Sequence, residues 1–478
     1  IQNGGRMTGW IDPTNVTIGS GSTWTMTNDS LVDHLANNGT IQFQTMQNGV
    51  GKVLTTQGNV SGSGMLVMNA QLGGSNPAHD LLVINGGQVT GSQGILVNNA
   101  GGNGSNATIR LVQVTNGGTV APGAFQLANS GGKVSAGFYD YYLKQGDADS
   151  VYNQVLTPQV NQSASIGVPL TINAAQTYSA LLVPTVNVLS SVLKDSDQLW
   201  VRGLYNQYKN SESSTVDSTN QMYGIQVGKD IYTHGDSEGG TEKAGVYLAY
   251  GVYNSWLYGQ FGGAPKANQG GNELINQSIG AYYVKKFSNE FYASVIGQVT
   301  RYGVTSSLLG GNVLNTTGFG YLASLEIGQP FEIYGKRLTV TPEAQVIVQQ
   351  IQMNNASFNG TDVQYSNTPI WTSRLGVKLA TESEPDAAGK KSSAWVAVNA
   401  YSTDGASPGA TFSSSNGLAT STTNATLPGL VGGVQMGASA DFTKSWSGNV
   451  TVNYMQGLQS SPVNQGFGVQ GVLQYRFD

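Results

Sequence analysis

Near its C-terminal end the chain reads VQGVLQYRF (residues 469–477). Every second residue from Val469 to Phe477 is apolar or glycine, and the residues between them are mostly polar. Successive side chains of a β-strand point to opposite faces, so this segment predicts a strand with one apolar and one polar face. Its last apolar positions, Tyr475 and Phe477, are aromatic.

The same period of two recurs back to residue 198. We count twelve alternating segments, at residues 198–209, 220–233, 243–258, 272–287, 290–305, 314–329, 337–353, 364–381, 392–403, 427–442, 446–457 and 465–477. Aromatic residues gather towards the ends of the segments. An apolar face towards lipid, a polar face towards a wet lumen and aromatic girdles are typical of an outer-membrane β-barrel. A soluble β-sandwich is the alternative, because it shows similar alternation.

The connections between these segments also favour a barrel. Alternate connections are long, at residues 210–219, 259–271, 306–313, 354–363, 404–426 and 458–464. Several of the others are short, at residues 288–289, 330–336 and 443–445. Bacterial barrels combine long outer loops with short periplasmic turns. An even number of strands places both ends of the barrel on the periplasmic side.

Residues 1–157 show a different pattern. Short apolar strips such as WTM (24–26), MLVM (65–68) and LLVI (81–84) recur between glycine and asparagine residues. Their spacing suits a right-handed parallel β-helix, in which each rung buries its apolar face on the next. An ordinary β-sandwich is the alternative here.

Residues 158–197 predict a linker that contains a helix. Asn173 is a suitable N-cap, and Pro184 is expected to kink or restart the helix. Tyr178 and Asn187 lie on the two halves of this segment. The segment is too polar for lipid and carries too little charge for an exposed helix. It fits a helix inside a wet enclosure, so we expect it to thread the pore of the barrel.

The composition agrees with an all-β protein. Glycine makes up 65 of 478 residues, charged residues are only 10%, and there is no cysteine. Disulfides and cysteine-ligated metals are therefore excluded. The net charge of −5 argues against nucleic-acid binding. No run of 18 apolar residues predicts a transmembrane helix.

This order of parts resembles the type V autotransporter family over essentially the whole chain. Residues 22–43, 80–86 and 96–99 resemble the entry and rungs of the family's autochaperone region, whose core we expect to include Trp24, Leu35, Leu82 and Leu96. Residues 199–202, 338–345 and 374–376 resemble barrel strands. Leu473, Tyr475 and Phe477 resemble the signal read by the barrel-assembly machinery. The family usually ends on the aromatic residue, whereas Asp478 follows here.

The resemblance implies three domains: a passenger end at residues 1–157, a pore-threading linker at 158–197 and a translocator barrel at 198–478. It implies a monomeric barrel in the bacterial outer membrane that exports its own passenger to the cell surface, with residues 1–150 promoting passenger folding. Expected partners are outer-membrane lipid, the barrel-assembly machinery and periplasmic chaperones. No nucleic acid or cofactor is expected.

Five ionisable residues fall on the polar phase of the predicted strands. These are Arg202, Glu326, Glu343, Arg374 and Arg476. Because an ionised group facing lipid is costly, we expect them to line the lumen. They could hold the linker helix there, or they could be solvated without contacting it. Some autotransporters cut themselves at paired asparagines, but here Asn187 is followed by Val188.

Signals for catalysis are weak, and we expect no enzymatic activity and no metal site. His34, His79 and His234 are isolated in the sequence, without carboxylates at ligand spacing. Two other functions remain open. The β-helix could be an adhesin that binds a host or neighbouring cell, with the barrel as an anchor. The barrel could instead be an open, porin-like channel.

Overall fold

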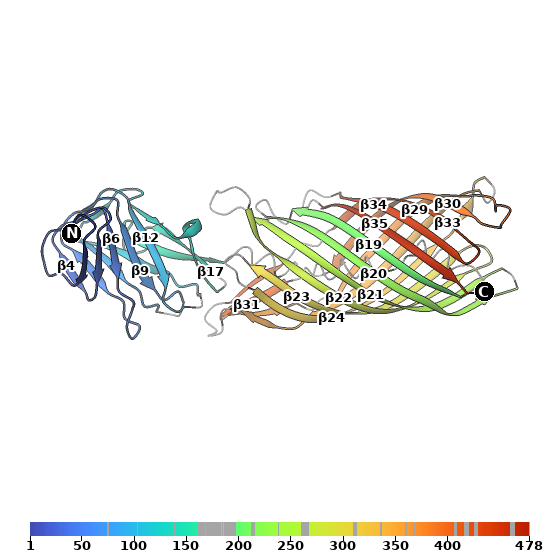
Figure 1. The fold of residues 1–478 in the computed structure, drawn as a ribbon, viewed down its shortest axis with the longest axis horizontal. Helices are drawn as coiled ribbons and strands as arrows, with labels where there is room; N and C mark the ends of the chain where they lie inside the picture. Colours follow the sequence, from blue (N-terminus) through green and yellow to red (C-terminus); the bar gives the residue numbers. More distant parts are fainter. Residues whose placement is uncertain are drawn as a thin grey trace. The chain divides into compact units, whose positions relative to one another are not determined.

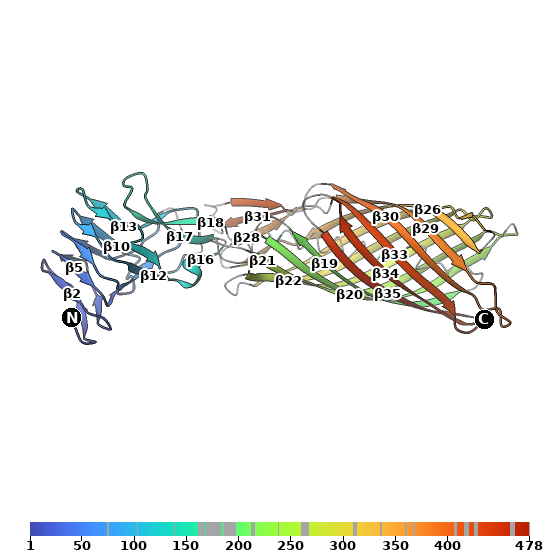
Figure 2. The same cartoon turned by 90° about the horizontal axis from the view of Figure 1, so that it is seen from above.

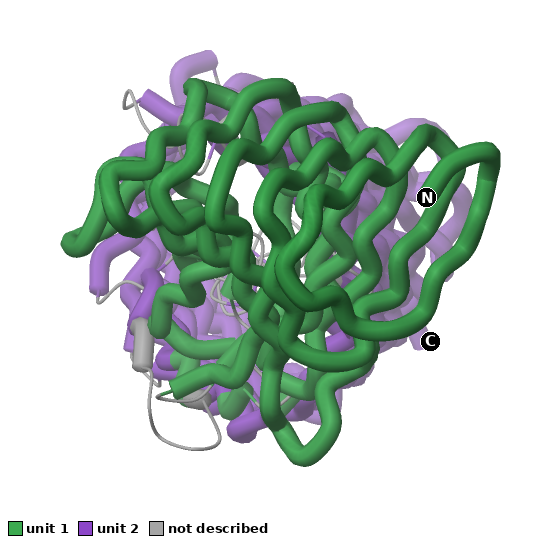
Figure 3. Tube along the Cα trace, turned by 90° about the vertical axis from the view of Figure 1, so that its left-hand side faces the viewer, with its two compact units in different colours: residues 1–161, 357–362, 412–421 green, residues 162–356, 363–411, 422–478 purple. Residues whose placement is uncertain are grey.

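A computed structural model describes the protein over most of its length. The described residues are 1–73, 76–102, 104–137, 139–160, 168, 183, 185, 197–211, 216–237, 239–259, 267–308, 313–334, 337–358, 361–366, 369–405, 409–414, 420–424, 429–458 and 464–477. They form two compact units (Figure 3). The first holds Ile1–Asn161 with the short segments Ser357–Asp362 and Phe412–Ser421, and the second holds the rest.

The first unit is a parallel β-solenoid built from three sheets, as predicted (Figure 2). One sheet contains β1 (Arg6–Gly9), β3 (Thr23–Met26), β6 (Thr40–Phe43), β9 (Met65–Ala70), β12 (Gln93–Asn99) and β15 (Phe125–Leu127). The second contains β4 (Ser30–Val32), β7 (Val53–Thr56), β10 (Leu81–Asn85) and β13 (Ile109–Thr115). The third contains β2 (Val16–Ile18), β5 (Leu35–Asn37), β8 (Val60–Ser61), β11 (Gln88–Val89) and β14 (Thr119–Val120).

Apolar side chains stack from rung to rung inside the solenoid. Trp24, Ile41, Leu66 and Ile95 are paired in register across four successive strands, and all four are buried. Each rung therefore covers the apolar face of the next, which is how a solenoid builds one continuous core from strands of two to seven residues.

At one end of the solenoid the strand direction changes. Strand β18 (Gln154–Val160) pairs antiparallel with the last parallel strand, β13. Strands β17 (Tyr139–Gln145) and β16 (Val134–Ala136) continue the same sheet, also antiparallel. This three-stranded cap covers the edge of β13, which would otherwise expose unpaired backbone groups.

The second unit contains a closed, twelve-stranded antiparallel barrel (Figure 1), which confirms the predicted fold. Its strands are β19 (Gln198–Ser211), β20 (Val216–Gly235), β21 (Thr241–Gly259), β22 (Ala267–Lys286), β23 (Tyr292–Leu308), β24 (Val313–Gly328), β26 (Leu338–Met353), β29 (Pro369–Glu382), β30 (Ser392–Gly405), β33 (Leu430–Asp441), β34 (Trp446–Gly457) and β35 (Asn464–Arg476). The pairing of β35 with β19 closes the sheet.

Burial alternates along the barrel strands with a period of two. In β24, every second residue from Leu314 to Gly328 is buried, and the intervening residues, including Phe319 and Leu325, are exposed. The exposed phase carries large apolar side chains, whereas the buried phase combines most of the polar side chains with inward aromatic and aliphatic ones such as Trp200 and Tyr247. The outer surface therefore suits hydrocarbon and the inner surface suits water.

The connections differ from the predicted ones in two respects. The strands run further than expected, so β19 ends at Ser211 and β20 begins at Val216, both within the predicted loop at 210–219. The predicted loops at 354–363 and 404–426 contain strands of their own. These are β27 (Ala356–Phe358), β28 (Thr361–Tyr365), β31 (Gly409–Ser414) and β32 (Thr420–Asn424), which form one four-stranded sheet.

At the opposite end of the barrel, the short β25 (Phe331–Glu332) extends the pairing of β26 within a predicted turn. The described residues include no helix that is long and apolar enough to span a membrane.

Candidate functional site

The candidate functional site is the lumen of the barrel, and one residue of the linker lies in it. Val183 is almost completely buried and belongs to a cluster of inward side chains from seven barrel strands. The other members are Trp200, Tyr247, Tyr282, Val284, Tyr292, Ile296, Leu322, Ile347 and Val472. The predicted linker residues Asn173, Tyr178, Pro184 and Asn187 fall outside the described residues.

The most highly charged part of the lumen centres on Arg374. Its guanidinium donates to Glu326 at 3.0 Å and to Glu343 at 2.9 Å, and all three side chains are buried. Lys378 also lies 3.2 Å from Glu343. Strands β24, β26 and β29 place these residues on one inner face. Buried charges are tolerated when they are paired and hydrogen-bonded, and this cluster meets that condition.

Further hydrogen bonds complete the contacts of Arg374. Its Nε donates to Gln345 at 3.1 Å, and a terminal nitrogen donates to Asn399 at 3.1 Å. The cluster therefore links four neighbouring strands, from β24 to β30, on the wall of the lumen.

A second ion pair lies on the wall formed by β19 to β22. Lys243 donates to Asp230 at 3.1 Å, and both side chains are completely buried. Tyr282 donates its hydroxyl proton to the other oxygen of Asp230 at 2.5 Å. Trp200 donates its indole N–H to Tyr282 at 3.1 Å. The aromatic residues that pack near Val183 are thus fixed by a buried carboxylate.

Sequence analysis did not single out Asp230 and Lys243. Asp230 shares the inner phase of β20 with Gln226, and Lys243 shares the inner phase of β21 with Tyr247. The alternation along these strands therefore predicts that both residues face the lumen. The partnership itself depends on the strand register, which includes an irregularity at Asp230 and was not readable from the sequence.

Arg202 and Arg476 have partners of their own. Arg202 is buried and donates to Gln226 at 2.8 Å and to Gln470 at 3.0 Å. Arg476 pairs with Asp441 at 2.5 Å, near the end of the barrel at which β35 stops. The described partners of the five predicted lumen residues are thus side chains of neighbouring barrel strands.

Aromatic side chains pack against glycines on the inner wall. A Cβ built on Gly280 would lie 2.2 Å from the ring of Tyr247, and one on Gly245 would lie 2.2 Å from the ring of Tyr282. Trp200 covers Gly228 in the same way, at 2.3 Å. Each ring lies flat on a neighbouring strand where no side chain is present, so it packs without filling the pore.

The C-terminal aromatic residues lie on the outside of the barrel. Leu473 and Phe477 are exposed. Tyr475 packs between Trp446 and Phe477, with ring centroids 5.0 and 5.2 Å apart. This row faces outward next to the edge at which β35 meets β19.

In the solenoid, three of the four predicted core residues are buried. Trp24 and Leu82 are completely inaccessible, and Leu35 is nearly so. Leu96 is only half-buried, because the inward phase of β12 falls on its neighbours Ile95 and Val97.

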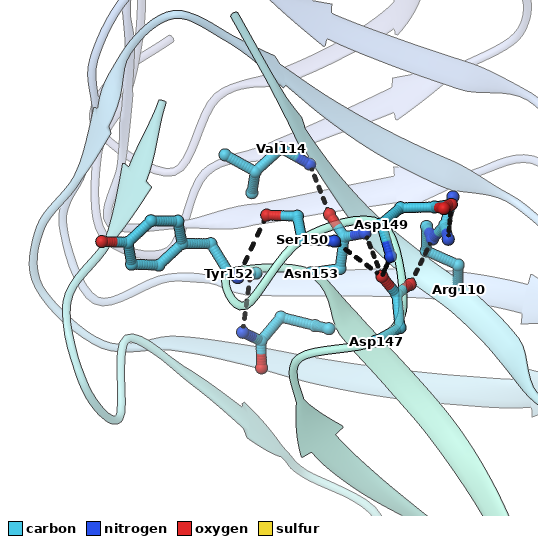
Figure 4. Close-up of polar contacts among 8 residues, drawn as sticks. Arg110, Val114, Asp147, Asp149, Ser150, Tyr152 and Asn153 are labelled. Carbon is cyan, nitrogen blue, oxygen red and sulfur yellow. Dashed lines mark hydrogen bonds and ion pairs between the residues drawn. The ribbon is translucent and has the colours of Figure 1, made fainter. Parts of the chain in front are cut away.

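The cap is attached to the last rung by a polar cluster around Asp147 (Figure 4). Arg110 of β13 donates to one oxygen of Asp147 at 2.7 Å and also pairs with Asp149. The second oxygen of Asp147 accepts from the backbone of Ser150 at 3.0 Å and from the amide of Asn153 at 2.8 Å.

Asn153 connects this turn to the solenoid. Its side-chain oxygen accepts from the backbone N–H of Val114 at 2.8 Å, beyond the point at which β18 stops pairing with β13. Burial opposes ionisation of Asp147, but the hydrogen bonds from Ser150, Asn153 and Arg110 outweigh it and hold the pKa of the carboxyl below its usual value. The contacts of Asp147 with Arg110, Ser150 and Asn153 therefore join the cap to the last rung. We call this group of four residues the charged staple.

The three histidines take up structural positions. The ring nitrogen Nδ1 of His34 accepts from the backbone of Asn59 at 2.9 Å. His79 lies beside the carbonyl of Pro77 at 2.8 Å, and His234 stacks on Tyr232. Among the described residues, no group of three histidines or carboxylates could hold a metal ion.

Two family models match the chain. The Autotransporter beta-domain matches residues 199–453, and the Autochaperone Domain Type 1 matches residues 30–143. The first match covers more than half of the 478 residues and runs from β19 into β34 of the barrel. The second coincides with the solenoid and part of its cap.

Three solved structures of low sequence identity are similar to this chain. The transport unit of AIDA-I from Escherichia coli is 16% identical, covers 65% of this chain and 98% of its own, and has a TM-score of 0.49. The translocator domain of NalP from Neisseria meningitidis is 13% identical, covers 64% and 99%, and scores 0.48. The beta domain of BrkA from Bordetella is 15% identical, covers 59% and 100%, and scores 0.45.

The assignment rests on the family models, because their matched segments coincide with the two architectures found in the structure. Neither matched model describes an enzyme. A barrel with a lipid-facing outer surface, preceded by a capped solenoid, is the arrangement expected of a unit that stays in the outer membrane and exports the chain attached to it. The chain belongs to the autotransporter family, as an outer-membrane translocator barrel together with the autochaperone end of its exported passenger.

Proposed function

We propose that residues 158–197 remain inside the barrel as a linker, so that residues 1–157 stay joined, through the lumen, to the anchored residues 198–478. The burial of Val183 among inward side chains of seven strands carries this proposal. The buried ionic clusters hold neighbouring strands of the lumen wall together around the linker. The linker then blocks free diffusion through the pore after export.

Planar-bilayer conductance tests this arrangement. The full chain is compared with residues 198–478, which lack the solenoid and the linker. We expect a small conductance for the full chain and a much larger one for the barrel without its linker. An equally large conductance for both proteins would favour the open, porin-like channel. Heat-modifiable migration on a gel verifies that both barrels are folded.

We also propose that the barrel-assembly machinery recognises the outward row of Leu473, Tyr475 and Phe477. These side chains lie on the lipid-facing side of the last strand, where a partner can reach them before the barrel closes. Replacing Phe477 with alanine should reduce the amount of folded barrel in the outer membrane. The control is Phe467→Ala, which removes another exposed aromatic side chain of the same strand. An equal loss in both variants would contradict a specific signal.

The barrel should act as a monomer, because its twelve long strands, all of them within the described residues, come from one chain and pair into a closed ring. An adhesive role for residues 1–157 is a separate proposal, supported only by the surface position expected of the passenger. Binding of the full chain, displayed on cells, to host or neighbouring cells would test it.

A further inference from the structure

A groove of about 570 Å³ lies on the outer wall of the barrel where the first and last strands meet. Its floor contains Gly203 of β19 and Gly471 of β35, which are paired directly across the closure. Both glycines lie on the lipid-facing phase, between Val201 and Tyr205 on β19 and between Val469 and Leu473 on β35. We call this depression the closure groove.

Neither close packing nor backbone conformation requires glycine at these two positions. A Cβ on Gly203 would meet no atom within 4 Å, and one on Gly471 would only touch a backbone oxygen at 4.0 Å. Neither residue is among those with positive φ. The inner-wall glycines differ, because there a Cβ would strike an aromatic ring. The closure groove is thus open space on a surface that faces lipid.

Aromatic and aliphatic side chains form the walls. Tyr205 and Tyr223 are paired across β19 and β20, with ring centroids 5.6 Å apart. Tyr250, Ile225, Val252 and Val469 complete the lining. Across the strands, the two glycines lie between Ile225 of β20 and Val450 of β34, the residues that pair with them on either side. The depth of the depression is that of the missing side chains, which a flexible hydrocarbon chain can fill.

Hydrogen-bonded polar groups border the groove on the side of the long loops. The hydroxyl of Tyr205 donates to Gln207 at 3.0 Å, and that of Tyr223 donates to Gln221 at 2.7 Å. Lys209 is the next outward residue of β19 after Gln207, and it is exposed. Within the described part of the chain it forms no ion pair. The nearby carboxylate of Asp217 accepts from Ser211.

The outward side chains of β19 therefore form an ordered series. From the short-turn end they read Leu199, Val201, Gly203, Tyr205, Gln207 and Lys209. The series passes from apolar surface through the groove and an aromatic ring to an amide and then an ammonium group. This is the order of groups along an anionic lipid, from its acyl chain to its phosphate.

We propose that the closure groove binds one acyl chain of an anionic lipid of the outer leaflet, with Lys209 next to the phosphate. The argument rests on the outer-membrane position of the barrel, because lipid covers this face there. The bound chain would fill the depression left by the two glycines. It would pack against the pair of strands β19 and β35, which must form for the barrel to close.

The test measures how strongly the full chain restrains spin-labelled lipids in phosphatidylcholine bilayers. The probes are phosphatidylglycerol and phosphatidylcholine, each labelled near the end of one acyl chain. The wild-type chain should hold a motionally restricted fraction with a preference of about fivefold for phosphatidylglycerol, the effect of one lysine near an anionic lipid. Lys209→Gln should abolish this preference and leave the restricted fraction of phosphatidylcholine unchanged.

The double variant G203L/G471L fills the floor and should remove the additional restricted fraction for both probes. Its matched control is Gly297→Leu, which adds the same side chain to another outward glycine with no atom within 4 Å. If the double variant does not fold, as judged by heat-modifiable migration, Gly471→Ala gives a smaller version of the same change.

Equal restricted fractions in the wild type, the groove variants and the control would overturn the proposal. A dimer in detergent that the groove variants dissociate would overturn it as well, because the occupant would then be a second copy of the chain. Conductance does not depend on the groove, so failure of the proposed linker arrangement remains distinguishable.

Discussion

At the scale of single residues, Arg374 is the most consequential charge in the lumen. It is the shared partner of two buried carboxylates, Glu326 and Glu343. Replacing it with methionine leaves both carboxylates without their arginine in a buried environment. We expect Arg374→Met to destabilise the barrel by about 3–5 kcal/mol in urea unfolding followed by heat-modifiable migration.

A matched pair of variants separates this effect from a general loss of charge. Arg337→Gln removes an exposed arginine that pairs with the exposed Glu384, and it should cost less than about 1 kcal/mol. The triple variant R374M/E326Q/E343Q should recover part of the loss, because it also removes the negative charge of the two buried carboxylates. Equal effects of Arg374→Met and Arg337→Gln would contradict a buried ionic cluster.

The contact between Gly280 and Tyr247 makes a second prediction. A methyl group on Gly280 would lie 2.2 Å from the ring, so Gly280→Ala must displace it. We expect a loss of about 1–3 kcal/mol and slower appearance of the folded band on a gel, since overpacking is destabilising.

Gly297→Ala provides the comparison, because its methyl group would meet open space. It should change stability by less than about 0.5 kcal/mol. If Gly280→Ala folds as fast as Gly297→Ala, the aromatic packing on the inner wall is not as described.

The charged staple of the cap makes a third prediction, on pH. The pKa of Asp147 lies below its usual value of 3.8, so its stabilising effect is complete above that pH and is lost as the pH falls through the folded-state pKa. The protection of residues 139–160 against hydrogen exchange, corrected for the intrinsic exchange rate at each pH, should therefore fall below about pH 4 in the wild type.

Asp147→Asn should exchange faster already at neutral pH and change less on acidification, because the titrating group is gone. Asp12→Asn, at an exposed carboxylate distant in sequence, is the control and should behave like the wild type. Parallel pH profiles for the wild type and Asp147→Asn would show that the staple does not stabilise the cap.

At the scale of elements, the barrel strands were the most predictable part of the chain. Each is at least 12 residues long and alternates between lipid and lumen, so period two repeats several times within one strand. The solenoid strands have only two to seven residues. With so few repeats of the alternation, the predicted inward phase is easily wrong by one position. Leu96 shows this, because its neighbours Ile95 and Val97 occupy the inward phase instead.

Other elements carried little signal in the sequence. Strands β31 and β32 consist mainly of glycine, serine, threonine and asparagine, which also typify loops. Lumen partners such as Asp230 with Tyr282 and Glu326 with Arg374 lie about 50 residues apart. The phase of a strand predicts that each faces inward, but the strand register decides which residues meet.

The cap of the solenoid provides the prediction at this scale. Leu156 of β18 is completely buried and is paired with Ile109 on one side and Leu143 on the other. Leu156→Pro removes a backbone donor in the middle of the sheet. We expect the exported residues 1–157 to become sensitive to proteinase K at the cell surface.

Leu156→Val keeps the strand and most of the apolar volume, so it should remain protease-resistant. Barrel insertion should be unaffected in both variants, as judged by heat-modifiable migration. Resistance of Leu156→Pro would mean that the solenoid does not depend on its cap.

At the scale of the whole molecule, the composition fits a chain that crosses a membrane through a pore made by its own C-terminal half. Charged residues are scarce and cysteine is absent, so no disulfide can form within residues 1–157 before export. Charged side chains of the lumen wall pair with one another, while the outer surface presents apolar side chains to lipid. The two halves of the chain thus serve one process, export followed by folding outside.

The absence of cysteine also permits a direct test of the central claim, that the linker lies in the lumen. Val183→Cys is combined in the full chain with a cysteine at an inward cluster residue, Ile296 or Ile347. The controls place the second cysteine one residue earlier, at the outward Val295 or Val346. A short thiol cross-linker is then added to outer membranes that contain the variants.

The account predicts cross-links from Val183 to the inward positions and none to their outward neighbours. Cross-linking that ignores this one-residue alternation, or that is absent at both inward positions in folded barrels, would contradict a linker held inside the pore.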